Sequence, residues 1–113
     1  MQNDGQHLDV CKRYGAAFLE TDLALNVGIS RTFDLGVLPL NGLRHPPQAG
    51  TSGWYIWTGE FSERSDFFVP ICGNHLAEKC PDAMRFLCLA PGWRFLIAPT
   101  HEDVWFDPVL LDA

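Results

Sequence analysis

The sequence predicts a single α+β domain in which a small, mainly antiparallel sheet packs against short helices. Two observations support this fold class. Several short stretches alternate apolar and polar residues and end at Gly, Pro or Asn, as strands do, whereas the stretch between residues 74 and 88 has helical spacing. A length of 113 residues with 47% hydrophobic content also suits one hydrophobic core.

The N-terminal segment is expected to be helical. Residues 4–14 carry an apolar stripe that includes Leu8 and Cys11, and Gly15 can end such a helix in a left-handed conformation. We therefore divide the chain into an N-terminal helical segment, residues 1–22, and an α+β domain, residues 23–113. The first predicted strand covers residues 23–30, because Leu23, Leu25, Val27 and Ile29 alternate with small or polar residues.

Residues 31–52 are predicted to form a long surface loop, because Gly, Pro and Asn are frequent there. A loop of this length in a small domain is usually a binding element or partly mobile. It contains the polar pair Arg44 and His45. One interpretation is that Arg44 pairs with a nearby carboxylate and His45 caps a turn; the other is that both side chains contact a partner.

The next strand, residues 53–59, is apolar on both faces. Trp54 and Ile56 share one face, and Tyr55 and Trp57 share the other, which is typical of a central strand. These aromatic residues either belong to the core or act as binding hot spots. A short edge strand at residues 67–70 follows and ends at Pro70. Two short helices, residues 74–79 and 81–88, are expected next.

A β-hairpin is predicted at the C-terminal end, with strands at residues 92–98 and 103–107 and a polar turn between them. Side-chain alternation places Trp93 and Phe95 on one face of the first strand and Leu96 on the other. The turn and the strand after it carry a polar cluster that consists of His101, Glu102, Asp103 and Asp107. A solvated turn is one interpretation of this cluster, and an acid/base or metal site is the other. We expect the following residues to be largely buried: Trp93, Phe95, Leu96, Ile56 and Leu76.

The charge of the chain excludes several classes of partner. Fourteen acidic and eight basic side chains give a formal net charge of −6. Phosphate binding needs concentrated Lys and Arg, so we expect neither nucleic acid nor an anionic membrane as a partner. No stretch reaches the roughly 18 apolar residues that a membrane span needs, and the start of the chain lacks a secretory signal pattern. We therefore expect a cytoplasmic protein with a basic partner.

The cysteines and the missing motifs argue against a metal, a cofactor and an enzyme. In a reducing compartment Cys11, Cys72, Cys80 and Cys88 are expected to remain free thiols. No CxxC or HxxxH pair indicates a metal site, so we expect no metal and no cofactor. Nucleophile, phosphate-loop and dinucleotide motifs are absent from the sequence, so we identify no catalytic residues.

Several uncommon sequence words occur in one order: GLRHPP at residues 42–47, SGWYIW at 52–57 with Gly59-Glu60, Cys80-Pro81, PGWRFLIA at 91–98 and EDVWFD at 102–107. Together they resemble immunity protein family 33 of bacterial polymorphic-toxin systems, over roughly residues 23–112. The resemblance implies a cytoplasmic protein, encoded beside a secreted toxin, that binds and neutralises that toxin. It implies no catalytic residues.

The sequence thus supports one principal hypothesis and two alternatives. The first is an immunity protein, a monomer or weak homodimer, whose acidity makes a nuclease with a basic cleft a plausible target. Its expected contact residues are Arg44, His45, Glu102, Asp103 and Trp57. The second is a small-molecule-binding or hydrolytic domain with an aromatic pocket formed by Trp54, Trp57, Arg44 and His45. The third is a structural subunit.

Overall fold

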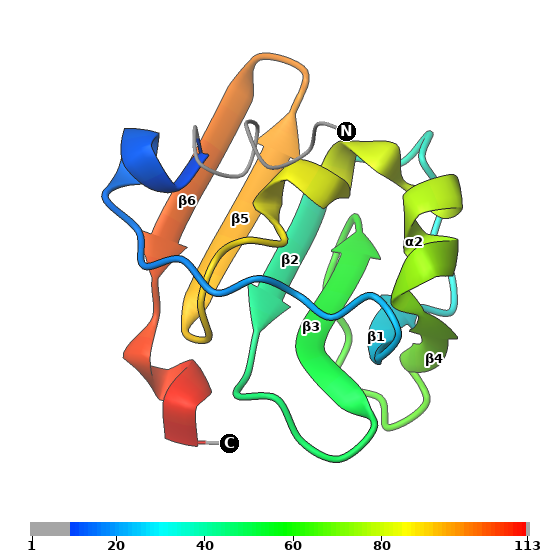
Figure 1. The fold of residues 1–113 in the computed structure, drawn as a ribbon. Helices are drawn as coiled ribbons and strands as arrows, with labels where there is room; N and C mark the ends of the chain where they lie inside the picture. Colours follow the sequence, from blue (N-terminus) through cyan, green and yellow to red (C-terminus); the bar gives the residue numbers. More distant parts are fainter. Residues whose placement is uncertain (1–9, 113) are drawn as a thin grey trace.

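The computed structural model describes residues 10–112, in which six strands form one sheet with helices packed on one of its faces (Figure 1). The strand order is β4-β1-β3-β2-β5-β6. The strands are β1 (Asn26–Ser30), β2 (Leu40–Arg44), β3 (Thr51–Thr58), β4 (Phe68–Cys72), β5 (Trp93–Ala98) and β6 (His101–Phe106). The helices are α2 (Gly73–Lys79) and the 3-10 helices η1 (Pro81–Phe86) and η2 (Pro108–Asp112). The predicted α+β class is confirmed.

The sheet is mainly antiparallel, as predicted, with one parallel pair formed by β1 and β3. The predicted edge strand is also present as β4, at one end of the strand order, but it does not end at Pro70: it continues to Cys72, with Pro70 in its middle. The two predicted helices are separate, and Pro81 occupies the first turn of η1. Proline has no amide hydrogen to donate, so both positions tolerate it without loss of a backbone hydrogen bond.

The first strand begins three residues later than predicted. Asp22 holds residues 23–25 in a turn, in which its side chain accepts a hydrogen bond from the amide of Ala24 at 2.9 Å and its carbonyl accepts one from Leu25 at 3.0 Å. The carbonyls of Leu23 and Leu25 then accept hydrogen bonds from the first amides of α2. Turn formation by Asp therefore overrides the alternating pattern here.

The prediction of a continuous loop over residues 31–52 is wrong, because β2 lies inside it and pairs with both β3 and β5. β2 was not predicted because Gly42, in its middle, is a residue typical of loops. A Cβ atom at Gly42 would lie 2.2 Å from the ring of Phe95, so only glycine lets that ring lie across β2. The glycine that resembles a loop residue is therefore a packing residue in the middle of the sheet.

The hairpin of β5 and β6 is confirmed, but its turn is shorter than predicted. β6 starts at His101, so only Pro99 and Thr100 connect the strands. Glu102 and Asp103 consequently lie within β6 and point to opposite faces. Val104 pairs with Phe95 in the register and is buried, which fixes Glu102 on the same face as the core.

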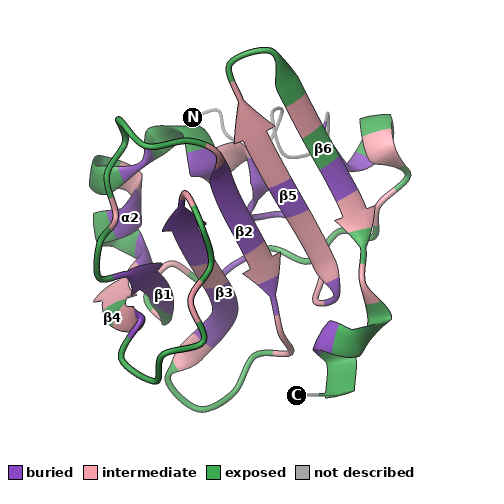
Figure 2. Cartoon of the chain, turned by 180° about the vertical axis from the view of Figure 1, so that it is seen from behind, coloured by how far each residue is buried: buried purple, intermediate pink, exposed green. Residues whose placement is uncertain are grey.

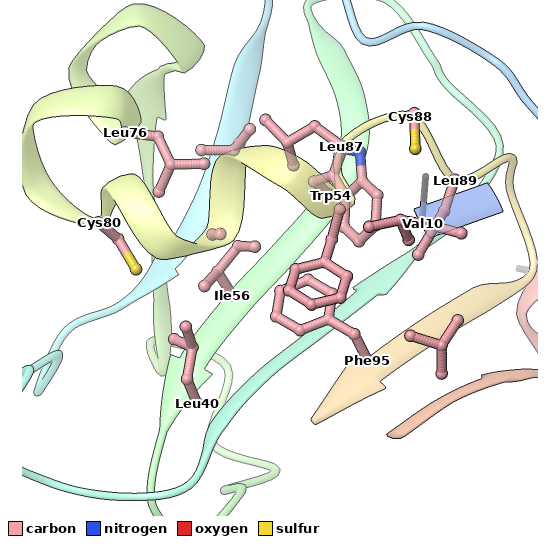
Figure 3. Close-up of a cluster of buried hydrophobic side chains, with 14 of the residues drawn as sticks. Val10, Leu40, Trp54, Ile56, Leu76, Cys80, Leu87, Cys88, Leu89 and Phe95 are labelled. Atoms are coloured by element: carbon pink, nitrogen blue, oxygen red, sulfur yellow. The ribbon is translucent and has the colours of Figure 1, made fainter. Parts of the chain in front are cut away.

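The core lies between the sheet and the helices (Figure 3). Phe95 from β5 stacks on Phe86 from η1, with ring centroids 4.4 Å apart, and Trp54 and Ile56 from β3 are fully buried beside them. Of the predicted core residues, Phe95, Ile56 and Leu76 are buried as expected. Trp93 and Leu96 are only half-buried, and Leu96 lies on the face away from the helices.

The N-terminal segment crosses the helical face of the sheet from β6 towards β1 (Figure 1). Residues 10–14 are helical, and Gly15, with a φ of 63°, ends this turn as predicted; residues 4–9 of the predicted helix lie outside the described residues. Val10 is 3% exposed and belongs to the core. The division of the chain after residue 22 stays a prediction.

Candidate partner-binding face

The face of the sheet opposite the helices carries the exposed part of the strands. Strand alternation places Leu43 of β2, Tyr55 and Trp57 of β3, Leu96 of β5 and Trp105 of β6 on this face. Figure 2 views the molecule from this side. Chain segments that follow β1 and β3 cross one half of the face, whereas no described segment crosses β5 and β6 there.

The crossed half is closed by aromatic side chains. Trp57 is 4% exposed and contacts Phe61 and Phe68, with ring centroids 5.4 and 6.0 Å apart. Phe67 in turn contacts Phe61 and Phe68. Edge-to-face packing of this kind adds to the stabilisation from apolar burial. Trp57, a predicted contact residue, is therefore a member of this packed cluster and presents little surface.

The uncrossed half, which we call the open face, comprises Leu43, Arg94, Leu96, Asp103 and Trp105, together with Asp107, which pairs with Arg94 just after β6. Two rows of cross-strand neighbours build it: Leu43, Arg94 and Trp105 form one row, and Leu96 and Asp103 lie side by side in the next. Leu43, Leu96 and Trp105 are half-buried, and Asp103 is exposed. The open face thus combines apolar surface with an acidic side chain on rigid strands.

Arg94 is the one basic residue on the open face, and its charge is already paired. Its Nη1 donates to Asp107 Oδ2 at 3.1 Å, and its guanidinium lies 5.3 Å from the Trp105 ring centroid. Asp103 adds a second carboxylate. Two acidic groups against one guanidinium leave the open face negative, which favours a partner with positive charge.

Arg44 lies on the helical face and is structural. It is 2% exposed, and its guanidinium donates to the carbonyls of Ser52, Leu19 and Leu89 at 3.1, 2.7 and 2.8 Å. The interpretation that Arg44 pairs with a carboxylate is wrong, because these acceptors are backbone carbonyls and no described carboxylate forms a salt bridge with it. Burial lowers the pKa of Arg44 to about 10.

His45 is half-buried at the end of β2. Its Nδ1 lies 2.9 Å from the carbonyl oxygen of Leu110, and its ring meets Tyr55 edge to face at 5.6 Å. It therefore contacts the C-terminal helix η2 and does not cap a turn. A shallow hollow of about 240 Å³ lies beside it, lined also by Pro46 and Gln48.

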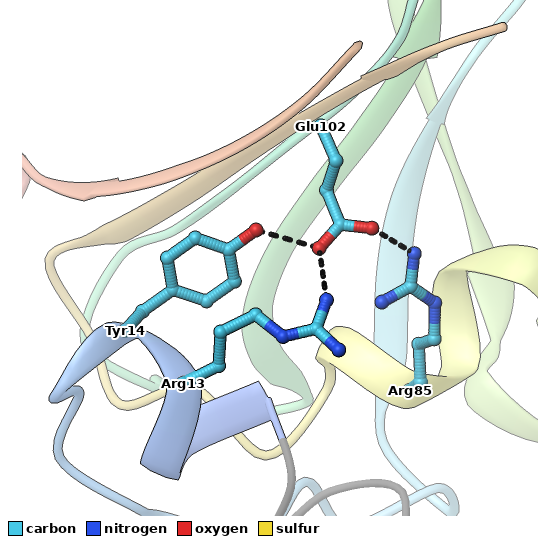
Figure 4. Close-up of polar contacts among 4 residues, drawn as sticks. All are labelled: Arg13, Tyr14, Arg85 and Glu102. Carbon is cyan, nitrogen blue, oxygen red and sulfur yellow. Dashed lines mark hydrogen bonds and ion pairs between the residues drawn. The ribbon is translucent and has the colours of Figure 1, made fainter. Parts of the chain in front are cut away.

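Glu102 is on the helical face and joins three elements (Figure 4). One carboxylate oxygen accepts hydrogen bonds from Tyr14 at 2.6 Å and Arg13 at 3.3 Å, and the other accepts one from Arg85 of η1. The hydrogen bond from Arg85 is the main cause that lowers the pKa of Glu102. The expectation that Glu102 belongs to an acidic turn is therefore wrong; it ties the N-terminal turn to β6.

The structure does not assemble the pocket of the alternative hypothesis. Arg44 and Trp54 pair on the helical face, whereas Trp57 and His45 contact rings of the opposite face. Among the described residues, no three His, Cys, Asp or Glu side chains are grouped to hold a metal ion. No helix within residues 10–112 is long and apolar enough to cross a membrane.

Of the predicted contact residues, only Asp103 lies on the open face. Leu43, Arg94, Leu96 and Trp105 were not predicted as a contact set. Their alternation along β5 and β6 was readable from the sequence, but the side on which the helices pack was not.

A family model described as an Imm33-like domain matches residues 6–107. No curated protein and no solved structure matches the chain significantly.

Proposed function

Since the chain belongs to the Imm33-like domain family, we propose that it is an immunity protein that binds and neutralises a cognate bacterial toxin in the cytoplasm. The observation that carries this proposal is the extent of the family match, residues 6–107, which includes all six strands of the sheet. Family membership indicates a protein that acts by binding another protein, so inhibition by occlusion rather than catalysis is the proposed mode of action.

The open face is the proposed binding surface. Leu43, Leu96 and Trp105 can supply apolar anchors, because Trp is among the residues that most often dominate binding energy when a partner excludes water around it. The strands that hold them are paired in the sheet, so little conformational entropy is lost when a partner docks. Asp103 is the proposed charged contact within this surface.

The proposed target is a toxin with a basic surface. The chain has a net charge of −6, and the open face contributes Asp103 and Asp107 against the single guanidinium of Arg94. Charge of this sign steers a basic partner during encounter and repels nucleic acid. A nuclease fits this description, because its active cleft must attract phosphate.

Co-expression with the toxin gene encoded beside this chain tests the proposal. We expect rescue of growth and a co-purifying one-to-one complex. Trp105→Ala should weaken the complex mainly by speeding dissociation, since it removes an anchor rather than the steering charge. The matched control is Phe106→Ala, because Phe106 is the next residue of β6, 45% exposed, and points to the helical face.

Continued toxicity without a complex, while both proteins are soluble, would contradict the proposed function. Equal loss of binding in Trp105→Ala and Phe106→Ala, with both variants folded, would leave the function intact and remove the open face as the binding surface.

A further inference from the structure

Two cysteines that are distant in the sequence meet inside the fold. The Sγ atoms of Cys11 and Cys88 lie 3.2 Å apart across a separation of 77 positions. Cys11 belongs to the N-terminal helical turn, and Cys88 lies between η1 and β5. Cys72 and Cys80 do not share this arrangement: the Cys72 thiol donates to the carbonyl of Leu23 instead. No described cysteine is in a disulfide.

The two sulfur atoms differ in access. Cys11 is 7% exposed, and a hollow of about 320 Å³ lined by Lys12, Gly15 and Ala16 reaches it. Cys88 is 0% exposed, and burial raises the pKa of its thiol. A small oxidant therefore reaches Cys11 first.

We propose that Cys11 and Cys88 form an oxidation site at which hydrogen peroxide, or another small two-electron oxidant, generates a disulfide between the N-terminal turn and the segment before β5. The site is independent of the proposed toxin binding, because neither cysteine lies on the open face. In the reducing cytoplasm the dithiol form prevails, and oxidant exposure converts it.

The chemistry takes two steps. In the first, the Cys11 thiolate attacks one oxygen of hydrogen peroxide, the O–O bond breaks, and the released hydroxide takes up a proton and leaves as water. The product is a sulfenic acid on Cys11. In the second, Cys88 Sγ attacks the sulfur of Cys11, the S–O bond breaks, and hydroxide leaves as water with the thiol proton of Cys88. Two electrons pass from the sulfurs to the peroxide, which yields two water molecules.

The disulfide would fix the N-terminal turn to the core. In the dithiol form, Val10 and the hydrogen bonds of Arg13 and Tyr14 to Glu102 hold this turn. A bridge across 77 positions restricts the unfolded chain strongly. We expect oxidation to raise the melting temperature of the full chain by at least about 5 °C.

The test treats the purified full chain with hydrogen peroxide, blocks remaining thiols and maps the peptides without reductant. We expect the intact mass to fall by two hydrogen atoms, one cross-link between Cys11 and Cys88, and complete reversal by dithiothreitol. Cys11→Ala and Cys88→Ala should each abolish the cross-link and the rise in melting temperature. Cys72→Ala is the matched control and should retain both.

The proposal would be overturned if the thiols of Cys11 and Cys88 in the wild-type chain can both still be alkylated after the protein has been oxidised and then unfolded. A peptide map dominated by a link to Cys72 or Cys80 would overturn it as well. Because the peptide map is made on the wild-type chain, it tests the proposal even if an alanine variant fails to fold.

Discussion

Trp57 and Trp105 lie on the same face of one sheet, yet one is 4% exposed and the other is half-buried. The difference comes from the connections rather than from the strands. The segment after β3 is long enough to bring Phe61 against Trp57 and Phe67 against Phe61, whereas β5 and β6 are joined by Pro99 and Thr100 alone. A two-residue turn cannot fold back over its own hairpin, so that half of the face stays open.

This comparison separates residues that stabilise the fold from residues that are available to a partner. On the crossed half, Trp57 and Phe67 are already buried within the chain, under a covering layer in which Phe61 stays 53% exposed. On the open face, half-buried side chains still have apolar area to remove from water, which is the main driving force of association. Substitutions on the two halves should therefore affect different measurements.

The largest expected effect is on stability, at two consecutive residues of β5. Phe95→Ala should lower the free energy of unfolding by about 3–5 kcal/mol, because it leaves a cavity beneath the stacked ring of Phe86. Leu96→Ala on the open face should cost about 1 kcal/mol or less. Urea unfolding of both variants measures the difference, and equal midpoints would contradict the assignment of the two faces.

The two tryptophans give the next largest effect. Trp57→Ala should cost about 3 kcal/mol, since its loss also leaves Phe61 and Phe68 without a ring partner. Trp105→Ala should cost about 1 kcal/mol, because solvent already reaches its side chain. Thermal unfolding followed by calorimetry compares them. A larger loss for Trp105→Ala would mean that the open face is a stabilising surface.

Glu102 and Asp103 are neighbours in β6 that point to opposite faces of the sheet, so substitutions there compare the two faces directly. Glu102→Gln should lower stability at pH 7 by about 1–2 kcal/mol, as expected for loss of hydrogen bonds to charged groups. Because folding lowers the pKa of Glu102, its contribution is present above the unfolded value of about 4.3 and disappears as the pH falls through the folded value.

The difference between wild type and Glu102→Gln should therefore shrink as the pH falls below the unfolded value of about 4.3. Asp103→Asn is the neighbouring control and should stay within about 0.5 kcal/mol of wild type at pH 7. If the difference in stability between wild type and Glu102→Gln persists at low pH, the ion pairs of Glu102 are not the cause of that difference.

The smallest expected effect concerns association with the toxin. Asp103→Asn should slow association by a factor of about 2–5 at low salt and have less effect near 0.15 M salt, where screening shortens the range of charge attraction. Stopped-flow mixing with the purified toxin measures the rate. If the association rate of the wild type does not change with salt, charge does not steer the encounter, and this part of the proposal is wrong.

The strands that were predicted from the sequence are those whose pattern arises locally. Residues 53–59 and 92–98 alternate aromatic and aliphatic side chains, and the structure contains β3 and β5 there. β2 escaped prediction because Gly42 is selected by the ring of Phe95, which lies more than fifty positions away. A pattern within one segment does not contain such a requirement.

The open face was harder to predict than the fold. Asp103 was singled out for its charge, whereas Leu96 was expected in the core and Arg44 in a loop. Which face of a sheet receives the helices depends on where α2 and η1 pack, and alternation alone is symmetric between the two faces. Burial of an Arg is rare enough that a surface position was the sound expectation from the sequence.

The guanidinium of Arg44 also makes folding cooperative. Its three carbonyl acceptors come from the N-terminal segment, from β3 and from the approach to β5, so the buried cation is satisfied only when all three are in place. Detachment of the N-terminal segment alone would remove one acceptor from a charge that water does not reach. Backbone amides near Leu19 should therefore exchange with solvent only on the timescale of global unfolding, as one unit with the central strands.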